Sequence, residues 1–332
     1  RQRQMCIRDR SLITNDQFEM ITTDPERPVI IQGSAGSGKT TVALHRLAWL
    51  LHENNSQIKA EKTRVIVMNR SLAIYVSSTL PSMGIDDVQT STFNSWALSI
   101  IRKSVRGKPF FKFLNIPSFV EEIKFSEEIL NALSDWVKKQ SLVLDEEIKK
   151  QFLSRTAHQE AWLKSKDKPL LPRLRDFSHE VKLSNLPEAE KQQKLGFIKK
   201  QLSKLEDYLE DLYNLLSDTD HLKKYLPPNA KLTFNLDYLR RLTEKNRLRK
   251  NLDYFDMTLI LRLIQLKNGG LPDGKGGTIS LDHIVIDEAQ DFGPVEFAIM
   301  IDAVNDRRQV TIVGDVALKI LIARKFIGWY KV

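Results

Sequence analysis

Short apolar runs alternate with stretches of helical periodicity toward both ends of the chain. Four of these runs predict buried strands: 28–32, 64–68, 281–286 and 309–313. Residues 41–51 place apolar side chains three and four positions apart, which predicts a helix, and residues 71–80 also have a helical pattern. Because strands separated by helices favour a parallel sheet with right-handed crossovers, the expected fold class is α/β.

The pattern changes in the middle of the chain, between about 101 and 250. Glycine nearly disappears there, and Lys, Glu and Leu dominate. Residues 187–216 carry leucine and isoleucine at spacings of three and four, which predicts one amphipathic helix. We therefore expect residues 101–250 to form a helical insertion between residues 11–100 and 251–332, which share the alternating pattern.

Composition and charge narrow the class of protein only loosely. The 332 residues suffice for one large or two medium domains, and the apolar fraction of 42% is ordinary for a globular protein. The formal net charge of +9 fits a polyanionic partner such as nucleic acid. Cys6 is the single cysteine, which excludes a disulfide framework and favours a reducing compartment. No apolar stretch reaches membrane-spanning length, so we expect a cytoplasmic protein.

Both ends of the chain have unusual features. Residues 1–10 show neither helical nor strand periodicity and resemble translated vector or adaptor sequence, so we expect them to be a non-native leader. The chain ends at Val332, soon after the run at 309–313. We interpret the sequence as a fragment of a longer protein.

A glycine-rich loop separates the first predicted strand from the first predicted helix. Residues 33–40 fit the phosphate-binding pattern G-x-x-x-x-G-K-[ST]. The loop and the residue after it are Gly33, Ser34, Ala35, Gly36, Ser37, Gly38, Lys39, Thr40 and Thr41. Glycines let the backbone approach a phosphate, and the N–H groups at the helix start face the anion. Lys39 would direct a positive charge at the β- and γ-phosphates, and the Thr40 hydroxyl would bind Mg²⁺. The alternative is a glycine-rich turn before a core helix.

A second group of chemically informative residues follows the strand predicted at 281–286. Residues 286–291 read Ile-Asp-Glu-Ala-Gln-Asp, and ligands bind at the carboxyl ends of parallel strands. Asp287 would hold Mg²⁺, directly or through water, and Glu288 would orient and deprotonate an attacking water. Phosphoryl transfer needs mainly positioning and charge neutralisation, so a lysine, Mg²⁺ and a carboxylate cover much of the chemistry. The alternative is a solvated acidic turn.

Residues 33–40, 287–291 and 313–315 together resemble the first half of a superfamily 1 helicase of the UvrD/Rep type. The resemblance covers residues 11–100 and 251–332. It implies a P-loop NTPase with a RecA-like parallel sheet (domain 1A), interrupted by a helical insertion (domain 1B). It also implies an ATP-driven 3′-to-5′ DNA translocase that uses Mg²⁺ and acts on single-stranded DNA or a 3′-tailed duplex.

Two shorter matches imply further contacts with the nucleotide. Residues 15–17, Asn-Asp-Gln, resemble the Q motif of the family, in which Gln17 would bind adenine. The alternative is a helix N-cap with a surface glutamine. Arg46 matches a family arginine that lies near the nucleotide.

Two other stretches, 69–71 and 92–96, resemble family motifs that contact single-stranded DNA. The residues implied in that contact are Asn69, Arg70, Thr92, Phe93 and Trp96. Aromatic side chains can stack on bases, but Phe93 and Trp96 could equally belong to the core.

The chain departs from the family pattern in two ways. Leu318 stands where the family has a glutamine that couples the γ-phosphate to DNA, which puts that coupling in doubt. The second RecA-like domain and its arginines are not in the sequence. An arginine finger contributes about 10³–10⁵ in rate, so we expect the chain alone to bind Mg-ATP and hydrolyse it poorly.

The same motifs leave two other functions open. One is an RNA polymerase-associated remodelling ATPase of the HelD type, which uses similar motor domains. The other is a degenerate nucleotide-binding module, which Leu318 alone favours.

Overall fold

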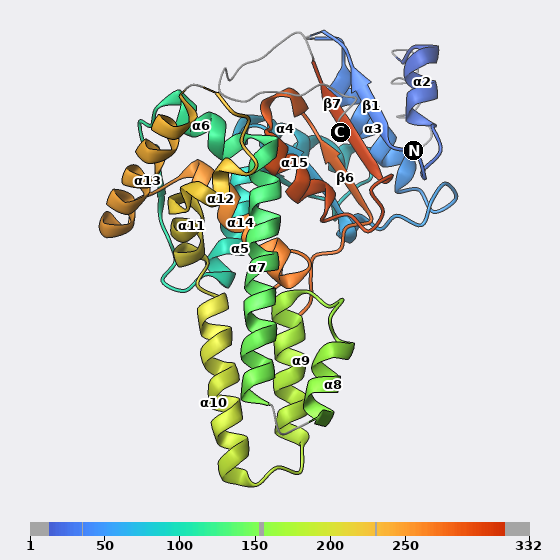
Figure 1. Cartoon of the computed structure of the whole chain (residues 1–332). Coiled ribbons are helices and arrows are strands. Elements are labelled where there is room, and N and C mark those ends of the chain that lie inside the picture. The colour runs from blue at the N-terminus through green and yellow to red at the C-terminus, as the bar shows by residue number, and fades with distance from the viewer. Residues whose placement is uncertain (1–12, 35, 153–155, 230, 316–332) are drawn as a thin grey trace. The chain divides into compact units, whose positions relative to one another are not determined.

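Two units make up the described part of the chain (Figure 1). The computed structural model describes residues 13–34, 36–152, 156–229 and 231–315. The first unit contains residues 13–96 and 280–315, and the second contains residues 97–279. The sequence pattern predicted the boundaries of the helical insertion near residues 100 and 250. The second boundary lies later because helix α14 (Tyr254–Asn268) packs against helices of the second unit.

A five-stranded sheet organises the first unit. Its strands are β1 (Val29–Gln32), β2 (Thr63–Val67), β3 (Gln89–Thr92), β6 (His283–Ile286) and β7 (Val310–Gly314). They lie in the order β1-β7-β6-β2-β3, and every neighbouring pair is parallel. All residues of β6 and β7 are buried, as expected for central strands covered on both faces. The predicted α/β class with a parallel sheet is confirmed.

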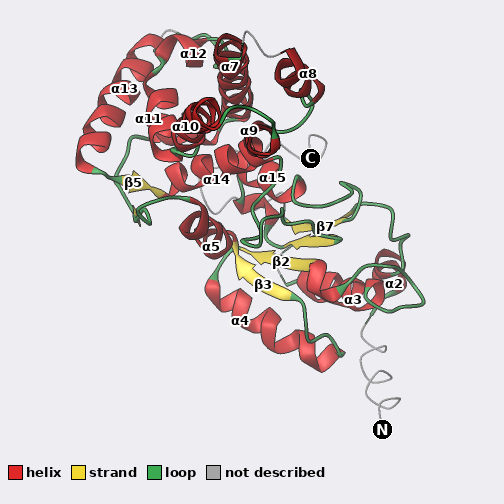
Figure 2. Ribbon diagram, turned by 90° about the horizontal axis from the view of Figure 1, so that it is seen from below, coloured by secondary structure: helices red, strands yellow, loops and turns green. Residues whose placement is uncertain are grey.

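Helices cover both faces of this sheet (Figure 2). The helices that belong wholly to the first unit are α2 (Asn15–Ile21), α3 (Lys39–Leu50), α4 (Arg70–Thr79) and α15 (Pro294–Ile301). The described residues of this unit also form the short 3₁₀ segments η1 (Ala60–Lys62), η2 (Leu80–Met83) and η3 (Ala289–Asp291). In Figure 2, α3 and α4 lie on one side of the sheet and α15 on the other. Leu44 and Leu47 of α3 belong to a buried cluster with Val65, Val285 and Val313 of the strands.

The register of the strands brings three chain segments to one edge of the sheet. Gln32 at the end of β1 lies beside Gly314 at the end of β7. Ile286, the last residue of β6, lies beside Ile312 of β7. Because the strands are parallel, the loops that follow β1, β6 and β7 all leave from this edge.

The second unit is almost entirely helical. Helix α5 (Phe93–Ser104) leads into it from the first unit. It then contains α6 (Ser118–Phe125), α7 (Glu127–Gln151), α8 (Thr156–Lys164), α9 (Leu170–Leu183), α10 (Glu188–Leu205), α11 (Tyr208–Ser217), α12 (Thr219–Lys223), α13 (Leu232–Arg249) and α14. The short strands β4 (Phe111–Lys112) and β5 (Leu252–Asp253) pair in parallel.

The single helix predicted over 187–216 is wrong, because this stretch forms the two helices α10 and α11. The break lies at Glu206 and Asp207. The Asp207 side chain accepts a hydrogen bond from the backbone N–H of Glu210 at 3.1 Å and so starts a new helix. The leucine spacing continues across the break, which is why periodicity alone did not reveal it.

A buried ion cluster ties the end of the insertion to its beginning. The Lys124 ammonium of α6 lies 2.7 Å from Asp253 and 2.6 Å from Asp256, and all three side chains are buried. Asp253 and Asp256 also form a reciprocal capping box at the start of α14. Replacing Lys124 by a neutral residue would leave two buried carboxylates without a cation, and replacing both aspartates would leave a buried ammonium without an anion. Either change is expected to be strongly destabilising.

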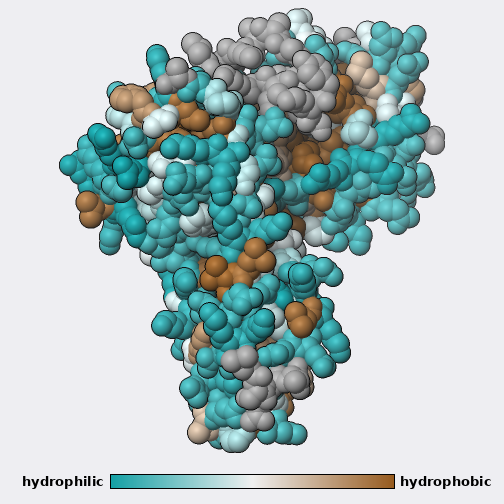
Figure 3. Space-filling view, viewed as in Figure 1, coloured by the Kyte–Doolittle hydropathy of each residue, from teal (hydrophilic) through white to brown (hydrophobic). Residues whose placement is uncertain are grey.

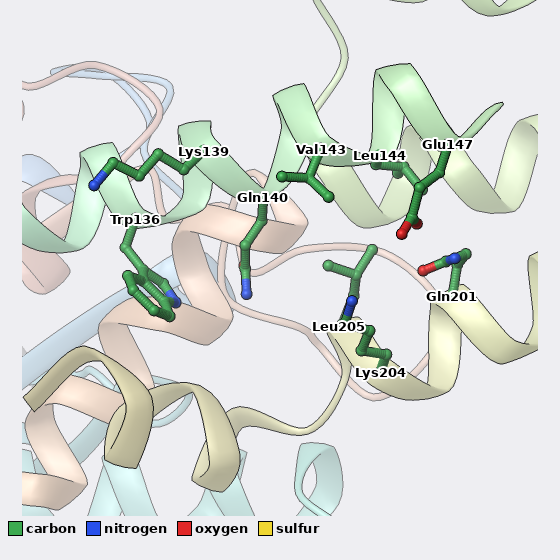
Figure 4. Close-up of a pocket in the computed structure, with 9 residues that line it drawn as sticks. All are labelled: Trp136, Lys139, Gln140, Val143, Leu144, Glu147, Gln201, Lys204 and Leu205. Carbon is green, nitrogen blue, oxygen red and sulfur yellow. The ribbon is translucent and has the colours of Figure 1, made fainter. Parts of the chain in front are cut away.

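The face of the molecule shown in Figure 3 is mostly hydrophilic, and its hydrophobic residues form small, separate patches. A hollow of about 230 Å³ lies between α7 and α10 in the second unit (Figure 4). Its lining combines Trp136, Val143, Leu144 and Leu205 with several polar side chains. None of the residues predicted to bind nucleotide or nucleic acid lines this hollow.

Candidate functional site

The glycine-rich loop lies between the end of β1 and the start of α3. Gly36 and Gly38 have φ angles of 78° and 80°, in the left-handed region that favours glycine. A Cβ on Gly33 would approach Ser37 Oγ to 2.6 Å, so the loop closes tightly on itself. Ser34, Ser37 and Thr41 are exposed, and Ala35 lies outside the described residues.

The N-terminus of α3, which directly follows the loop, presents positively polarised backbone N–H groups and the Lys39 ammonium. Gly38 is the N-cap residue and supplies no side-chain cap, and the first turn contains no acidic residue. The first backbone N–H groups of a helix have no partner within the helix and attract anions. Lys39 Nζ donates to the carbonyl of Ser34 at 2.9 Å, so the ammonium crosses the loop where a phosphate would bind.

Thr40 and Asp287 meet at the sheet edge, although they are 247 positions apart in sequence. The Thr40 hydroxyl donates to Asp287 Oδ2 at 2.8 Å. Asp287 is only 2% exposed, and this burial raises its pKa, while the bond from Thr40 acts in the opposite direction. A nearby cation would favour the ionised form of this carboxyl.

Glu288 follows Asp287 in a strained backbone conformation. Its φ of 53° is unusual for a residue with a side chain, and such strain often accompanies functional sites. Its backbone N–H donates to Asp287 Oδ1 at 2.9 Å, and Gln290 Nε2 donates to its Oε2 at 2.6 Å. The carboxylate is partly exposed at the same edge as the loop.

Gln17 lies beside the glycine-rich loop and also caps α2. Its Oε1 accepts a hydrogen bond from the backbone N–H of Thr14 at 3.1 Å, and the Thr14 side chain completes the capping box. A Cβ added to Gly38 would lie 4.0 Å from Gln17 Nε2, which places the amide against the loop. The N-cap of α2 is Thr14, one residue before the predicted stretch, and Gln17 is the third helical residue of the capping box. The contact of Gln17 with adenine stays a prediction.

Arg46 occupies a buried position. Its guanidinium donates to the backbone carbonyls of Met20, Ile21, Thr23 and Asp24 at 2.7–3.3 Å. Burial lowers its pKa to about 10, so it remains charged at neutral pH. In this structure Arg46 fixes the end of α2 to α3, and its predicted contact with the nucleotide stays a prediction.

The residues predicted to contact nucleic acid divide into a group that is exposed or half-buried and a group that is buried. Asn69 is the N-cap of α4, and its side chain accepts from the N–H of Leu72 at 2.9 Å. Arg70 and Thr92 line a groove of about 720 Å³ between α4 and β3. Five serine or threonine residues complete much of that lining: Ser77, Ser78, Thr90, Ser91 and Ser95. Sequence matching did not single out the serines of α4.

Phe93 and Trp96 belong to the buried group, at 2% and 3% exposure. Their rings pack edge to face with centroids 6.4 Å apart, and Phe93 also contacts Phe292. The structure thus favours the core alternative over base stacking for both side chains. Nothing in the local sequence distinguished the two, because both patterns place aromatics on one helix face.

The fold and the loop geometry define an α/β protein of the phosphate-loop class. A family model described as the UvrD/REP helicase N-terminal domain matches residues 13–320, and the chain belongs to this family. A curated relative, a probable DNA helicase II homolog of Mycoplasma capricolum subsp. capricolum, is 22% identical over 308 residues. The match covers 91% of this chain and 34% of the relative.

The described helices include none with the length and apolar content needed to span a bilayer. Leu318 and residues 1–10 lie outside the described residues, so the predictions that concern them stay predictions.

Proposed function

We propose that this chain is the ATP-binding part of a helicase motor that couples Mg-ATP hydrolysis to 3′-to-5′ movement on single-stranded DNA. The hydrogen bond between Thr40 and Asp287 carries the proposal. It joins the phosphate loop to the acidic segment at one sheet edge, and Glu288 follows immediately. Membership of the helicase family supports the same conclusion.

The residues present fit a magnesium ion. Mg²⁺ prefers oxygen ligands, and a hydroxyl and a carboxylate oxygen stand 2.8 Å apart here. Thr40 and Asp287 would hold the ion, and a bound ion would supply positive charge to the phosphate oxygens.

The protein groups have distinct roles in the proposed reaction. Backbone N–H groups of residues 36–40 and the Lys39 ammonium would hold the phosphates and balance their charge. Glu288 would accept a proton from the attacking water as that water forms its bond to the γ-phosphorus. The bond from that phosphorus to the bridging oxygen breaks, and its electron pair leaves with the diphosphate.

The groove between α4 and β3 is the proposed place for DNA on the first unit. Arg70 and the hydroxyl groups offer hydrogen bonds to phosphates without reading bases. The net charge of +9 supports a polyanionic partner. Phe93 and Trp96 are buried, so neither ring is accessible for stacking on a base in this conformation.

The test of this proposal is Glu288→Gln in the full-length protein. We expect a fall in ATP turnover of about 10²–10⁴-fold, the usual contribution of a general base, with the Kd for Mg-ATP nearly unchanged. Steady-state hydrolysis, with and without single-stranded DNA, and titration with a fluorescent ATP analogue measure the two quantities. Wild-type turnover in this variant would show that Glu288 is not the base. An absence of DNA stimulation in the parent would contradict the motor assignment.

A further inference from the structure

Gln290 occupies a position that the chemistry described above leaves without a role. It lies in η3, two residues after Glu288, and is only 3% exposed. Its Nε2 donates to Glu288 Oε2 at 2.6 Å, and its Oε1 accepts from the backbone N–H of Asp315 at 3.0 Å. One side-chain amide therefore links the acidic segment to the residue that directly follows β7.

The two hydrogen bonds determine the orientation of the amide. The NH₂ group faces a carboxylate, which only accepts, and the carbonyl oxygen faces an N–H, which only donates. A flipped amide would place oxygen against oxygen and N–H against N–H. The orientation is thus fixed by its partners at both ends.

This arrangement restrains Glu288 at both its backbone and its side chain. The backbone is held in its positive-φ conformation by the bond from Glu288 N to Asp287 Oδ1. The side chain is held by Gln290 at Oε2. A base must lie within about 2.6–3.2 Å of the proton that it takes, so a restrained carboxylate matters for the rate.

We propose that Gln290 is a positioning residue that holds Glu288 in its reactive orientation and ties that orientation to the end of β7. The inference rests on the proposed function, because it assumes that Glu288 is the base. Asp315 directly follows β7, so the same amide connects the Glu288 carboxylate to the end of this strand. Gln290 acts through Glu288 and touches no reacting atom.

The experiment compares Gln290→Ala and Gln290→Glu in the full-length protein. Glutamate at this position keeps an oxygen to accept from Asp315 N but loses the donor to Glu288, so it separates the two bonds. We expect both variants to lose about 10- to 100-fold in kcat, the scale expected for a misplaced catalytic group, while the Kd for Mg-ATP changes by less than about threefold. Gln57→Ala, at an exposed position of the same unit, is the matched control and should retain parental kcat.

A double-mutant cycle separates positioning from a purely structural role. On the Glu288→Gln background, Gln290→Ala should change the remaining turnover by less than about twofold, because the group that it positions is already absent. A further loss as large as in the parent would overturn the proposal, and so would unchanged kcat in both single variants. If Glu288→Gln itself keeps full turnover, the proposed function fails instead. Thermal unfolding of each variant identifies a loss caused by misfolding.

Discussion

At the scale of single residues, the candidate site depends on a few groups placed around the phosphate loop. The Lys39 ammonium crosses the loop, the Thr40 hydroxyl binds Asp287, and Gln290 holds Glu288. Each of these side chains forms a hydrogen bond that its chemical type suits. A lysine binds a carbonyl where a phosphate would sit, and a hydroxyl and a carboxylate form an oxygen pair suited to a hard cation.

The first residue-scale prediction concerns Lys39→Ala. We expect most of the affinity for Mg-ATP to disappear, at least about 10- to 100-fold, because hydrogen bonds to charged groups contribute about 1.5–3 kcal/mol. Titration with a fluorescent nucleotide analogue measures the Kd. Lys62→Ala, an exposed lysine at the end of η1, should bind nucleotide like the parent. Unchanged affinity in the Lys39 variant would show that this ammonium does not hold the phosphates.

At the scale of elements, helix ends determine where the chain turns. Asp207 starts α11 within a continuous leucine pattern, and Gly269 ends α14 with a φ of 70°. Glycine is needed at this end for two reasons. The left-handed conformation disfavours other residues, and a Cβ there would lie 2.2 Å from Pro169 Cγ.

The element-scale prediction compares two glycine-to-alanine changes in the second unit. Gly269→Ala should lower the free energy of unfolding by more than about 1–2 kcal/mol, the cost of the left-handed conformation, because the clash with Pro169 adds to it. Gly196→Ala should raise that free energy by up to about 1 kcal/mol, since Gly196 is exposed within α10 and has open space around it. Urea unfolding of both variants measures the difference. Equal effects of the two changes would contradict the assigned geometry.

At the scale of the whole molecule, both units bury titratable side chains. The second unit buries the Lys124 ion cluster, in which burial raises the pKa of Asp256 to about 6. The first unit buries His283 in the central strand β6, where its Nε2 lies 3.0 Å from the Thr311 hydroxyl. Burial, together with the positive charge of Arg46, lowers the pKa of His283 to about 3.

His283 contributes to the pH dependence of the stability of the first unit. Below about pH 6.5 the unfolded histidine binds a proton, whereas the folded one stays neutral down to about pH 3. The unfolded state therefore gains protons as the pH falls through this range, and the first unit loses up to about 1.4 kcal/mol per pH unit from this group. Unfolding of the parent and of His283→Gln from pH 7 to pH 4 tests this.

We expect a shallower loss of stability on acidification in His283→Gln than in the parent. His52→Gln, an exposed histidine of the same unit, should keep the parental slope. Identical slopes in the parent and in His283→Gln would mean that the pKa of His283 is the same in the folded and unfolded states.

The amino-acid sequence by itself determined the fold class and located the glycine-rich loop and the acidic segment as candidates for the site. These are local features, because strand and helix periodicity and the pattern of residues 33–40 depend on near neighbours in the chain. The same reasoning failed at Glu206 and Asp207, where a polar cap interrupts an unbroken apolar pattern. Local patterns indicate which face is apolar and do not show where a helix must stop.

The tertiary structure alone decided which groups meet and which are buried. The bond between Thr40 and Asp287 depends on the parallel register that places the ends of β1 and β6 at one edge. The burial of Phe93 and Trp96 and the link from Gln290 to Asp315 likewise depend on packing between distant segments. Hydrogen bonds and burial act between atoms that are close in space. The strand order that brings these segments together cannot be deduced from any single stretch of the sequence.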